Sequence, residues 1–389
     1  MNQGRTLFAQ VTDLLPRRAF ANAVQRYRGD HRVSQLSCWD QLLVMLLAQF
    51  TALPSLRQVI AALAAMGTQR YHCGIRGPVA RSTLADANEK RDYRIFQDTA
   101  LAMIGQARQE LPRDPELRRL HGGILALDST TIDLCLKLFP WAHFRRRKAG
   151  VKAHTLLDLR VGVPVFVRVS PAKTHDLWML DQIVAQPGAF YVLDKGYCDF
   201  RRLYRLHQAG AFFVTRAKRN LDYRIRQRRS VEAGGPVRWD RLVRLRGPKS
   251  RRLYPDTLRL VRYVDPDSGR RLTFLTNHQG LAAQTVALLY RKRWRIELFF
   301  KWVKGHLRLE AFFGTSANAV QTQVWIAVIA YVLVLRLKHR YQLPQDPHQI
   351  MSVLRIMSLE KRPVFTLFSE LRPDGKIGDD PNQLRLFDL

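Results

Sequence analysis

The stretches Ile124-Leu-Ala-Leu-Asp128 and Phe190-Tyr-Val-Leu-Asp194 are short apolar runs that each end in a carboxylate. Such a run is typical of a buried strand, and the end of a buried strand delivers its last side chain to the carboxyl edge of the sheet, where α/β proteins place their sites. Oxygen ligands at that edge suit Mg²⁺ or Mn²⁺. The alternative is that each aspartate only caps the turn or helix that follows, and for one such aspartate alone this alternative is favoured.

The segments around these runs alternate between strand and helix patterns. The sequence predicts two strands joined by a Gly-Val-Pro turn, over Lys152 to Arg160 and Val161 to Ser170. A helix is expected over Phe200 to Gln208, and another strand over Ala211 to Thr215. This alternation indicates an α/β domain. Residues 219 to 279 are rich in arginine and punctuated by glycine and proline, so we expect an inserted β-rich segment there.

Residues 1 to about 115 predict helices. Ser37 to Leu53 carries apolar residues at helical spacing, Pro54 ends it, and Ser55-Leu-Arg-Gln58 is a capping box for a second helix. Short helices dotted with arginine fit a helix-turn-helix reader of DNA, and a plain helical bundle fits them equally well. The apolar segment Val324 to Leu335 is shorter than the roughly 20 residues that cross a membrane, so we expect a buried core helix.

The charge of the chain indicates a polyanionic partner. Lysine and arginine number 64 against 32 aspartate and glutamate, which gives a formal net charge of +32. Such an excess opposes compaction unless a polyanion offsets it. Because the charge runs through the folded chain and is not gathered in a tail or beside a membrane segment, nucleic acid is favoured over a membrane surface or a ribosome. The four cysteines form no C-x-x-C pair, which argues against a zinc ribbon or a redox motif.

Four chemically different side chains share one face of a predicted helix: Tyr290, Arg293, Glu297 and Lys304. At about 100° per residue they fall at roughly 0°, 300°, 340° and 320°, within a sector of about 60°. The alternative is a solvated face on which Arg293 and Glu297 form an i,i+4 pair. A basic helix face with one acid, aimed at a sheet edge with two more, suits phosphodiester cleavage, since acids hold metal ions and cations bind phosphates.

The spacing Tyr-(2)-Arg-(3)-Glu-(6)-Lys, within YRKRWRIELFFKWVKGHL, matches the signature of the bacterial DDE transposases of insertion-sequence family four. The segments ALDSTTIDL around Asp128, YVLDKGYCDF around Asp194 and FVTRAKRN around Arg216 resemble the same family. The likeness runs from about 120 to 340, and the preceding region resembles the helical region of one subgroup. Four motifs in the same order argue against coincidence, and each catalytic position is intact.

This resemblance implies an α/β fold with an RNase H-like catalytic domain, an inserted β-rich subdomain and an all-α N-terminal domain. The expected domains are a helical DNA-binding domain over 1–115, a catalytic domain over 120–218 and 280–340, the β-rich insertion over 219–279, and a segment over 341–389 that serves dimerisation.

By the same resemblance, Asp128 on the first strand, Asp194 just after the fourth and Glu297 on a late helix are the catalytic residues. They would hold two Mg²⁺ ions, for which Mn²⁺ can substitute. The residues expected to contact DNA are Tyr290, Arg293 and Lys304 near the cut, and Arg216, Lys152 and Lys195 further along. For the last three, ordinary surface charge is an equally good interpretation.

Two histidines and two further acids remain as weaker candidates. His154 and His175 lie in segments that resemble the family, but a lone histidine is more often structural. Asp133 lies five residues beyond Asp128, outside the apolar run, and Asp158 sits within a predicted strand, so both rank below Asp128.

The activity that the resemblance implies is cut-and-paste DNA transposition: cleavage at the terminal inverted repeats of an insertion sequence, then transfer of the freed 3′-OH into target DNA. A hairpin at the element's end is expected from the relatives. Double-stranded DNA and a second copy of the chain are the expected partners, without a membrane, in the bacterial cytoplasm at the nucleoid. The alternatives are a catalytically idle, domesticated DNA-binding protein and another nuclease of the same fold, which would lack the Tyr-Arg-Glu-Lys face.

Overall fold

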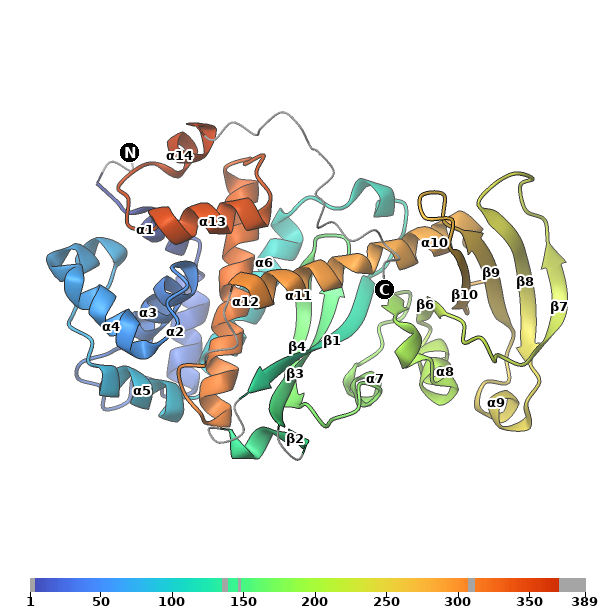
Figure 1. The fold of residues 1–389 in the computed structure, drawn as a ribbon, viewed down its shortest axis with the longest axis horizontal. Coiled ribbons are helices and arrows are strands. Elements are labelled where there is room, and N and C mark those ends of the chain that lie inside the picture. Colours follow the sequence, from blue (N-terminus) through green and yellow to red (C-terminus); the bar gives the residue numbers. More distant parts are fainter. Residues whose placement is uncertain (1–3, 135–138, 146–147, 307–311, 371–389) are drawn as a thin grey trace. The chain divides into compact units, whose positions relative to one another are not determined.

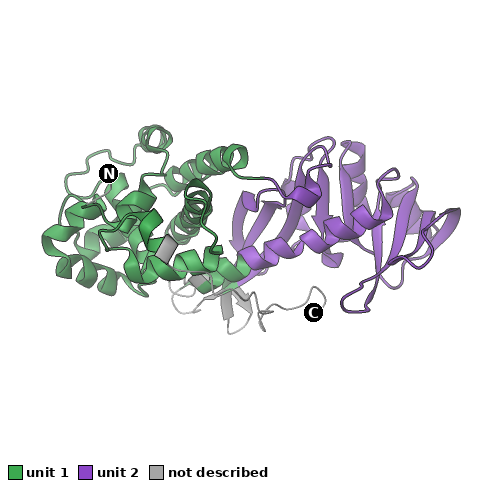
Figure 2. Cartoon of the chain, turned by 90° about the horizontal axis from the view of Figure 1, so that it is seen from above, with its two compact units in different colours: residues 1–112, 132–151, 300–378 green, residues 113–131, 152–299, 379–389 purple. Residues whose placement is uncertain are grey.

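The computed structural model describes residues 4–134, 139–145, 148–306 and 312–370 (Figure 1). The chain divides into two compact units, coloured separately in Figure 2. The helical unit falls within residues 1–112, 132–151 and 300–378, and the sheet unit within 113–131, 152–299 and 379–389.

The helical unit contains helices from both ends of the described chain. They are α1 (Leu7–Thr12), α2 (Arg17–Arg26), α3 (Cys38–Phe50), α4 (Leu56–Ala65), η1 (Gly67–Cys73), α5 (Arg81–Lys90), α6 (Arg94–Glu110), α12 (Ala317–Arg340), α13 (Pro347–Met357) and α14 (Val364–Glu370). One hydrogen bond of the predicted capping box is in place, because Ser55 Oγ accepts the Gln58 N–H at 3.3 Å. Ser37 Oγ caps α3 in the same way by accepting the Asp40 N–H at 3.0 Å.

Helix α12 forms the core of the helical unit, where α3, α5, α6 and α13 pack against it. In the part of the chain that the structure describes, α12 is the one helix long and apolar enough to cross a membrane. Yet 83% of its most apolar window is buried inside the structure, so the helix is covered by protein on nearly all sides. This burial confirms the core helix that the apolar segment from Val324 predicts.

Ten strands form one mixed sheet across the described residues. They are β1 (Ile124–Leu134), β2 (His143–Arg145), β3 (Lys148–Asp158), β4 (Val163–Pro171), β5 (Phe190–Leu193), β6 (Phe212–Arg216), β7 (Tyr223–Arg229), β8 (Val237–Leu245), β9 (Leu258–Val264) and β10 (Arg271–Thr276). The order is β2-β3-β1-β5-β6-β10-β9-β8-β7, and β4 pairs with β3. Strands β1, β5 and β6 run parallel to one another. Along the rest of the order, β6-β10-β9-β8-β7, each neighbouring pair is antiparallel.

The helices of the sheet unit include α7 (Trp178–Gln182), η4 (Lys195–Tyr197), α8 (Phe200–Gln208), α9 (Pro248–Leu253) and α10 (Ala283–Lys292). Leu203 and Leu206 of α8 pack with Tyr191, Leu193 and Phe213 in the buried cluster against the parallel strands. This packing covers the strands whose ends carry the candidate acids.

The β-rich segment 219–279 is built onto the central sheet. Its last strand, β10, pairs with β6 in the register Thr276↔Val214, and β9, β8 and β7 follow outward. The segment therefore continues the sheet from the strand next to β5, so one continuous surface runs from the candidate acids into the insertion.

The predicted long helix over Tyr290 to Leu307 is broken at Arg293 into α10 and α11 (Trp294–His306). The Arg293 N–H donates to Tyr290 O at 3.1 Å, and the Ile296 N–H donates to Arg293 O at 3.0 Å. These i to i+3 bonds tighten the turn and bring side chains three apart into line. Tyr290 and Arg293 therefore point the same way more closely than a regular α-helix would allow.

Candidate active site

Asp128 and Asp194 occupy matched positions on neighbouring parallel strands. The β1–β5 pairing runs from Ile124↔Phe190 to Leu127↔Leu193, so each aspartate is the next residue after the last pair. Adjacent strands lie about 4.8 Å apart, which brings the two carboxylates to one edge. The structure corrects one detail: β1 continues to Leu134, so Asp128 ends the pairing with β5 and not the strand itself.

The turn at Arg293 brings the signature helix to these acids. Arg293 Nη1 donates to Asp128 Oδ2 at 3.1 Å, and Nη2 donates to Glu297 Oε1 at 2.5 Å. The Tyr290 hydroxyl donates to Asp194 Oδ1 at 3.3 Å, and the Arg293 guanidinium lies 5.5 Å from the Tyr290 ring centre. Two aspartates, a glutamate, a phenol and a guanidinium thus form one contiguous cluster within the sheet unit.

Burial and the neighbouring groups give Asp128 a higher pKa than Asp194. Burial raises the pKa of Asp128 to about 6, although Arg293 acts in the opposite direction. Burial also acts to raise the pKa of Asp194, but the backbone N–H of Gly196 and the charge of Arg293 outweigh it and leave that pKa below its usual value. Asp194 therefore stays ionised more readily than Asp128.

The Arg293 guanidinium is the counter-ion of the Asp128 and Glu297 carboxylates in this structure. Its side chain is 12% exposed, and it lies between Asp128 and Glu297, each 22% exposed. Among the described residues, no three His, Cys, Asp or Glu side chains are grouped so that they could hold a metal ion without rearrangement. The donor chemistry nevertheless fits Mg²⁺ or Mn²⁺, because three clustered carboxylates offer hard oxygen ligands and repel one another without a cation.

The other predicted DNA contacts lie in different surroundings. The Lys152 ammonium donates to Thr174 O and Asp176 Oδ1, both at 3.0 Å, and its side chain is 16% exposed. Lys195 is exposed directly after Asp194. The Arg216 guanidinium lies 5.9 Å from the Tyr290 ring centre.

Lys304 is exposed on α11, in the part of that helix that belongs to the helical unit.

The weaker candidates have structural surroundings where these are described. His154 is fully buried, burial lowers its pKa to about 4, and its Nε2 is 2.8 Å from Ser170 Oγ. His175 is exposed, and its Nδ1 accepts the Leu177 N–H at 3.2 Å.

Asp158 is buried and paired with Arg160 at 3.2 Å, beside Leu159, whose N–H donates to Ile124 O at the start of β1. It therefore lies at the opposite end of the β1–β5 pairing from Asp128. The side chain of Asp133 lies outside the described part of the chain.

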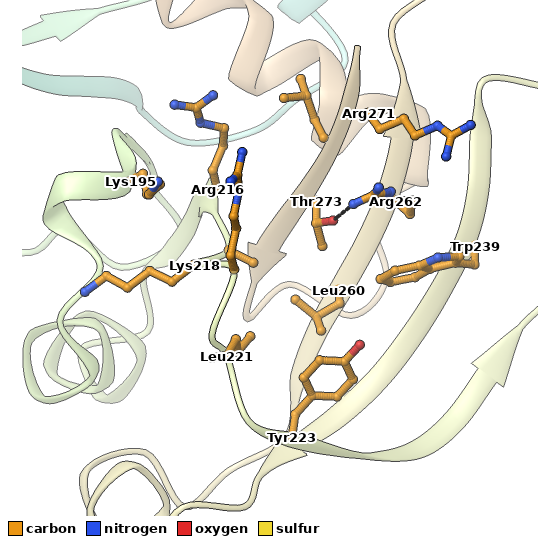
Figure 3. Close-up of a pocket in the computed structure, with 13 residues that line it drawn as sticks. Lys195, Arg216, Lys218, Leu221, Tyr223, Trp239, Leu260, Arg262, Arg271 and Thr273 are labelled. Carbon is orange, nitrogen blue, oxygen red and sulfur yellow. Dashed lines mark hydrogen bonds between the residues drawn. The ribbon is translucent and has the colours of Figure 1, made fainter. Parts of the chain in front are cut away.

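A basic hollow of about 560 Å³ is lined by Lys195, the residue after Asp194, and by residues of the β-rich insertion (Figure 3). Arg262 and Thr273 meet in it through a 2.7 Å hydrogen bond, and Trp239 and Tyr223 add aromatic surface. The cationic side chains that line it are Lys195, Arg216, Lys218, Arg219, Arg262 and Arg271. No acidic side chain is among its described lining residues.

Sequence reasoning missed most of this hollow. Its lining includes Leu260 and Arg262 on β9, and Arg271 and Thr273 with Leu272 between them on β10. Side chains two apart on a strand share a face, so this spacing was the available signal. It could be used only once the pairing of β10 with β6 was known.

Comparisons with known proteins agree with this arrangement. Residues 120–333 match the family model of the transposase DDE domain, and residues 3–76 match a domain of unknown function (DUF4372). The first match covers the strands β1 to β10 and the helix with Glu297, and it confirms the expected class: an RNase H-like α/β fold behind a helical N-terminal region.

Two curated proteins and one solved structure are similar to the chain. A protein named as a transposase from Sinorhizobium fredii is 38% identical over 256 residues, which cover 64% of this chain and 69% of that protein. One named as a transposase for an insertion sequence element of Geobacillus stearothermophilus is 30% identical over 257 residues, covering 65% and 66%. A piggyBac transposase synaptic complex with hairpin DNA has 12% identity and a TM-score of 0.45, covering 95% of this chain and 81% of that one.

Proposed function

The chain belongs to the DDE transposase family, and we propose that it cuts DNA at the ends of a bacterial insertion sequence with Asp128, Asp194 and Glu297. Members of this family are DNA transposases that use divalent metal ions. The observation that carries the proposal is the cluster itself: two aspartates at matched positions directly after the β1–β5 pairing meet a glutamate-bearing helix, which contacts Asp128 through Arg293.

Asp128, Asp194 and Glu297 would hold two Mg²⁺ ions, which would activate the attacking oxygen and stabilise the leaving 3′ oxygen of an in-line displacement. Tyr290 holds Asp194 through its hydroxyl, so this carboxylate keeps its orientation. Arg293 balances the charge of Asp128 and Glu297. If metal ions took over that task, the guanidinium would be free to face a phosphate.

The DNA strand beside the cut would follow the basic hollow. Arg216 and Lys195 connect the acids to this hollow, and Arg262 and Arg271 continue it across the insertion. The Nε of Arg216 is buried and has no hydrogen-bond partner among the described residues, so an anionic ligand would satisfy it. Tyr290, Arg293 and Lys304 are the further contacts that we propose near the cut.

The remaining parts of the proposal follow from the reaction. Water would cut first, and the freed 3′-OH would attack the opposite strand, which forms a hairpin and releases the flanking DNA. A second water molecule would open the hairpin, and the regenerated 3′-OH would then attack target DNA. We propose that residues 1–115 bind the element's end and that two copies act together, with 341–389 as the dimerisation segment. The protein would work in the bacterial cytoplasm, at the nucleoid.

The metal site can be tested by soaking crystals of the protein with Mn²⁺ and recording anomalous scattering. We expect Mn²⁺ density in contact with Asp128, Asp194 and Glu297, with the Arg293 guanidinium moved away from Asp128. Mn²⁺ bound only elsewhere, with Arg293 still paired to Asp128, would contradict the assignment.

The basic hollow can be tested by single alanine substitutions. Arg216→Ala and Arg262→Ala should each weaken DNA binding roughly fivefold, equivalent to about 1 kcal/mol, and lower the salt dependence by about one phosphate contact. Fluorescence anisotropy at several salt concentrations measures both quantities. Arg238→Ala is the matched control, because Arg238 is exposed on β8 and is not among the residues that line the hollow. Equal losses in all three variants would refute a specific role for the hollow.

A further inference from the structure

A fourth carboxylate, Asp176, joins three elements next to the cluster. Its Oδ1 accepts the Ser129 hydroxyl at 2.7 Å and the Lys152 ammonium at 3.0 Å. Lys152 also donates to Thr174 O at 3.0 Å. Ser129 lies on β1, Lys152 on β3, and Asp176 between β4 and α7, so one oxygen atom connects three segments of the sheet unit.

Ser129 connects this carboxylate to the first catalytic aspartate. Its backbone N–H donates to Asp128 Oδ1 at 2.8 Å, while its hydroxyl donates to Asp176. The pairing of β1 with β5 stops at Leu127, so that ladder no longer holds β1 where Ser129 begins. Beyond Leu127, β1 continues to Leu134 with β3 as its neighbour, and the contact between Ser129 and Asp176 adds a side-chain restraint to this part of the strand.

One side of this contact is closed to solvent, while the Asp176 side chain itself is 40% exposed. His154 is fully buried, its Nδ1 lies 3.9 Å from Asp176 Oδ1, and its Nε2 lies 2.8 Å from Ser170 Oγ. The Lys152 side chain is 16% exposed and already uses two of its three donors within the chain. A phosphate would have to compete with Asp176 for this ammonium, which is a poor arrangement for a DNA contact.

We propose that Asp176 is a positioning residue: with Lys152 as its counter-ion, it holds Ser129 and thereby sets the position of Asp128 for metal binding. This inference rests on the proposed function and changes the role of Lys152 from a DNA contact to a partner of Asp176. Hydrogen-bonded partners behind metal ligands commonly change metal affinity or activity about 10- to 100-fold when they are replaced.

The test measures Mn²⁺ binding by electron paramagnetic resonance in the DNA-free protein, together with DNA affinity and the cleavage rate at saturating DNA. Ser129→Ala and Asp176→Asn should each weaken Mn²⁺ binding about tenfold and slow cleavage about 10- to 100-fold, with DNA affinity within twofold of wild type. Because the two residues act as one unit, the double variant should be no worse than Asp176→Asn alone.

Lys152→Gln separates the two roles of that lysine. It should weaken Mn²⁺ binding in the same way and leave the salt dependence of DNA binding unchanged. Lys173→Gln is the matched control, since Lys173 is an exposed neighbour of Thr174 and should leave Mn²⁺ affinity unchanged.

Loss of DNA affinity in Lys152→Gln with unchanged Mn²⁺ binding would overturn the inference, and so would wild-type Mn²⁺ affinity in Ser129→Ala, the variant least able to disturb folding. If the wild-type protein itself bound no Mn²⁺ and cut no DNA, the proposed function would fail instead, so the two failures are distinguishable.

Discussion

Glu297→Gln is expected to slow Mg²⁺-dependent DNA cleavage by at least about a thousandfold, equivalent to about 4 kcal/mol of lost transition-state stabilisation. A neutral amide is a much weaker ligand for a hard cation than a carboxylate, so the metal ions would lose one of their three holders. The fold should persist, because the amide oxygen can still accept the hydrogen bond that Arg293 now gives to Glu297. Single-turnover kinetics measures the rate, and anisotropy should show unchanged DNA affinity.

A charge-matched control separates the metal role from net charge. Glu232→Gln removes the same charge at an exposed position of the sheet unit and should cleave like the wild type. Cleavage that is lost equally in both variants would mean that the overall charge, and not the metal site, is responsible. Full activity of Glu297→Gln would remove this residue from the catalytic set.

Asp240→Ala should give the largest loss of stability, about 3–5 kcal/mol, because it leaves a buried guanidinium without its carboxylate. Arg259 donates to both oxygens of Asp240, at 2.8 and 2.6 Å, and the two side chains are 2% and 5% exposed. Arg259 also donates to Leu281 O at 2.5 Å, which ties β9 to the segment before α10. Urea unfolding followed by circular dichroism measures the change.

This ion pair also supports the basic hollow, since Trp239 and Arg262 lie on the same strands as Asp240 and Arg259. DNA affinity should therefore fall together with stability in Asp240→Ala. The double variant Asp240→Leu with Arg259→Met should recover much of the lost stability, because it leaves no buried charge unpaired. A loss below about 1 kcal/mol in Asp240→Ala would show that solvent reaches Arg259 and that the pair is not a buried one.

The sequence could predict the edge where the aspartates meet, because both apolar runs are read locally and the ends of parallel strands share one edge. It could not predict that β1 continues to Leu134, because the apolar run stops at Asp128; only the β-branched Thr130, Thr131 and Ile132 hint at a longer strand. The break at Arg293 carries no proline or glycine. Of the contacts that accompany it, the pair with Glu297 is a local i,i+4 contact, whereas the contact with Asp128 is tertiary and is not contained in the local sequence.

The local sequence also does not show whether a given lysine or arginine binds DNA or is paired within the fold. Lys152 and Lys195 look alike along the chain, yet one is paired with Asp176, 24 positions away, and the other is exposed. Likewise, Arg262 resembles any surface arginine until β10 is known to lie beside β6. Long-range pairing decides which charges face a common hollow and which are neutralised within the fold.

The most direct test of the central claim is a cleavage assay on DNA that carries the terminal inverted repeats flanking this gene. Wild-type protein in Mg²⁺ and Glu297→Gln are compared on this DNA and on the same DNA with scrambled repeats, and the cut ends are sequenced. We expect cuts at the repeat ends by the wild type alone, none on the scrambled DNA, and none in EDTA. Cleavage that ignores the repeats, or that Glu297→Gln performs equally well, would contradict the proposed function.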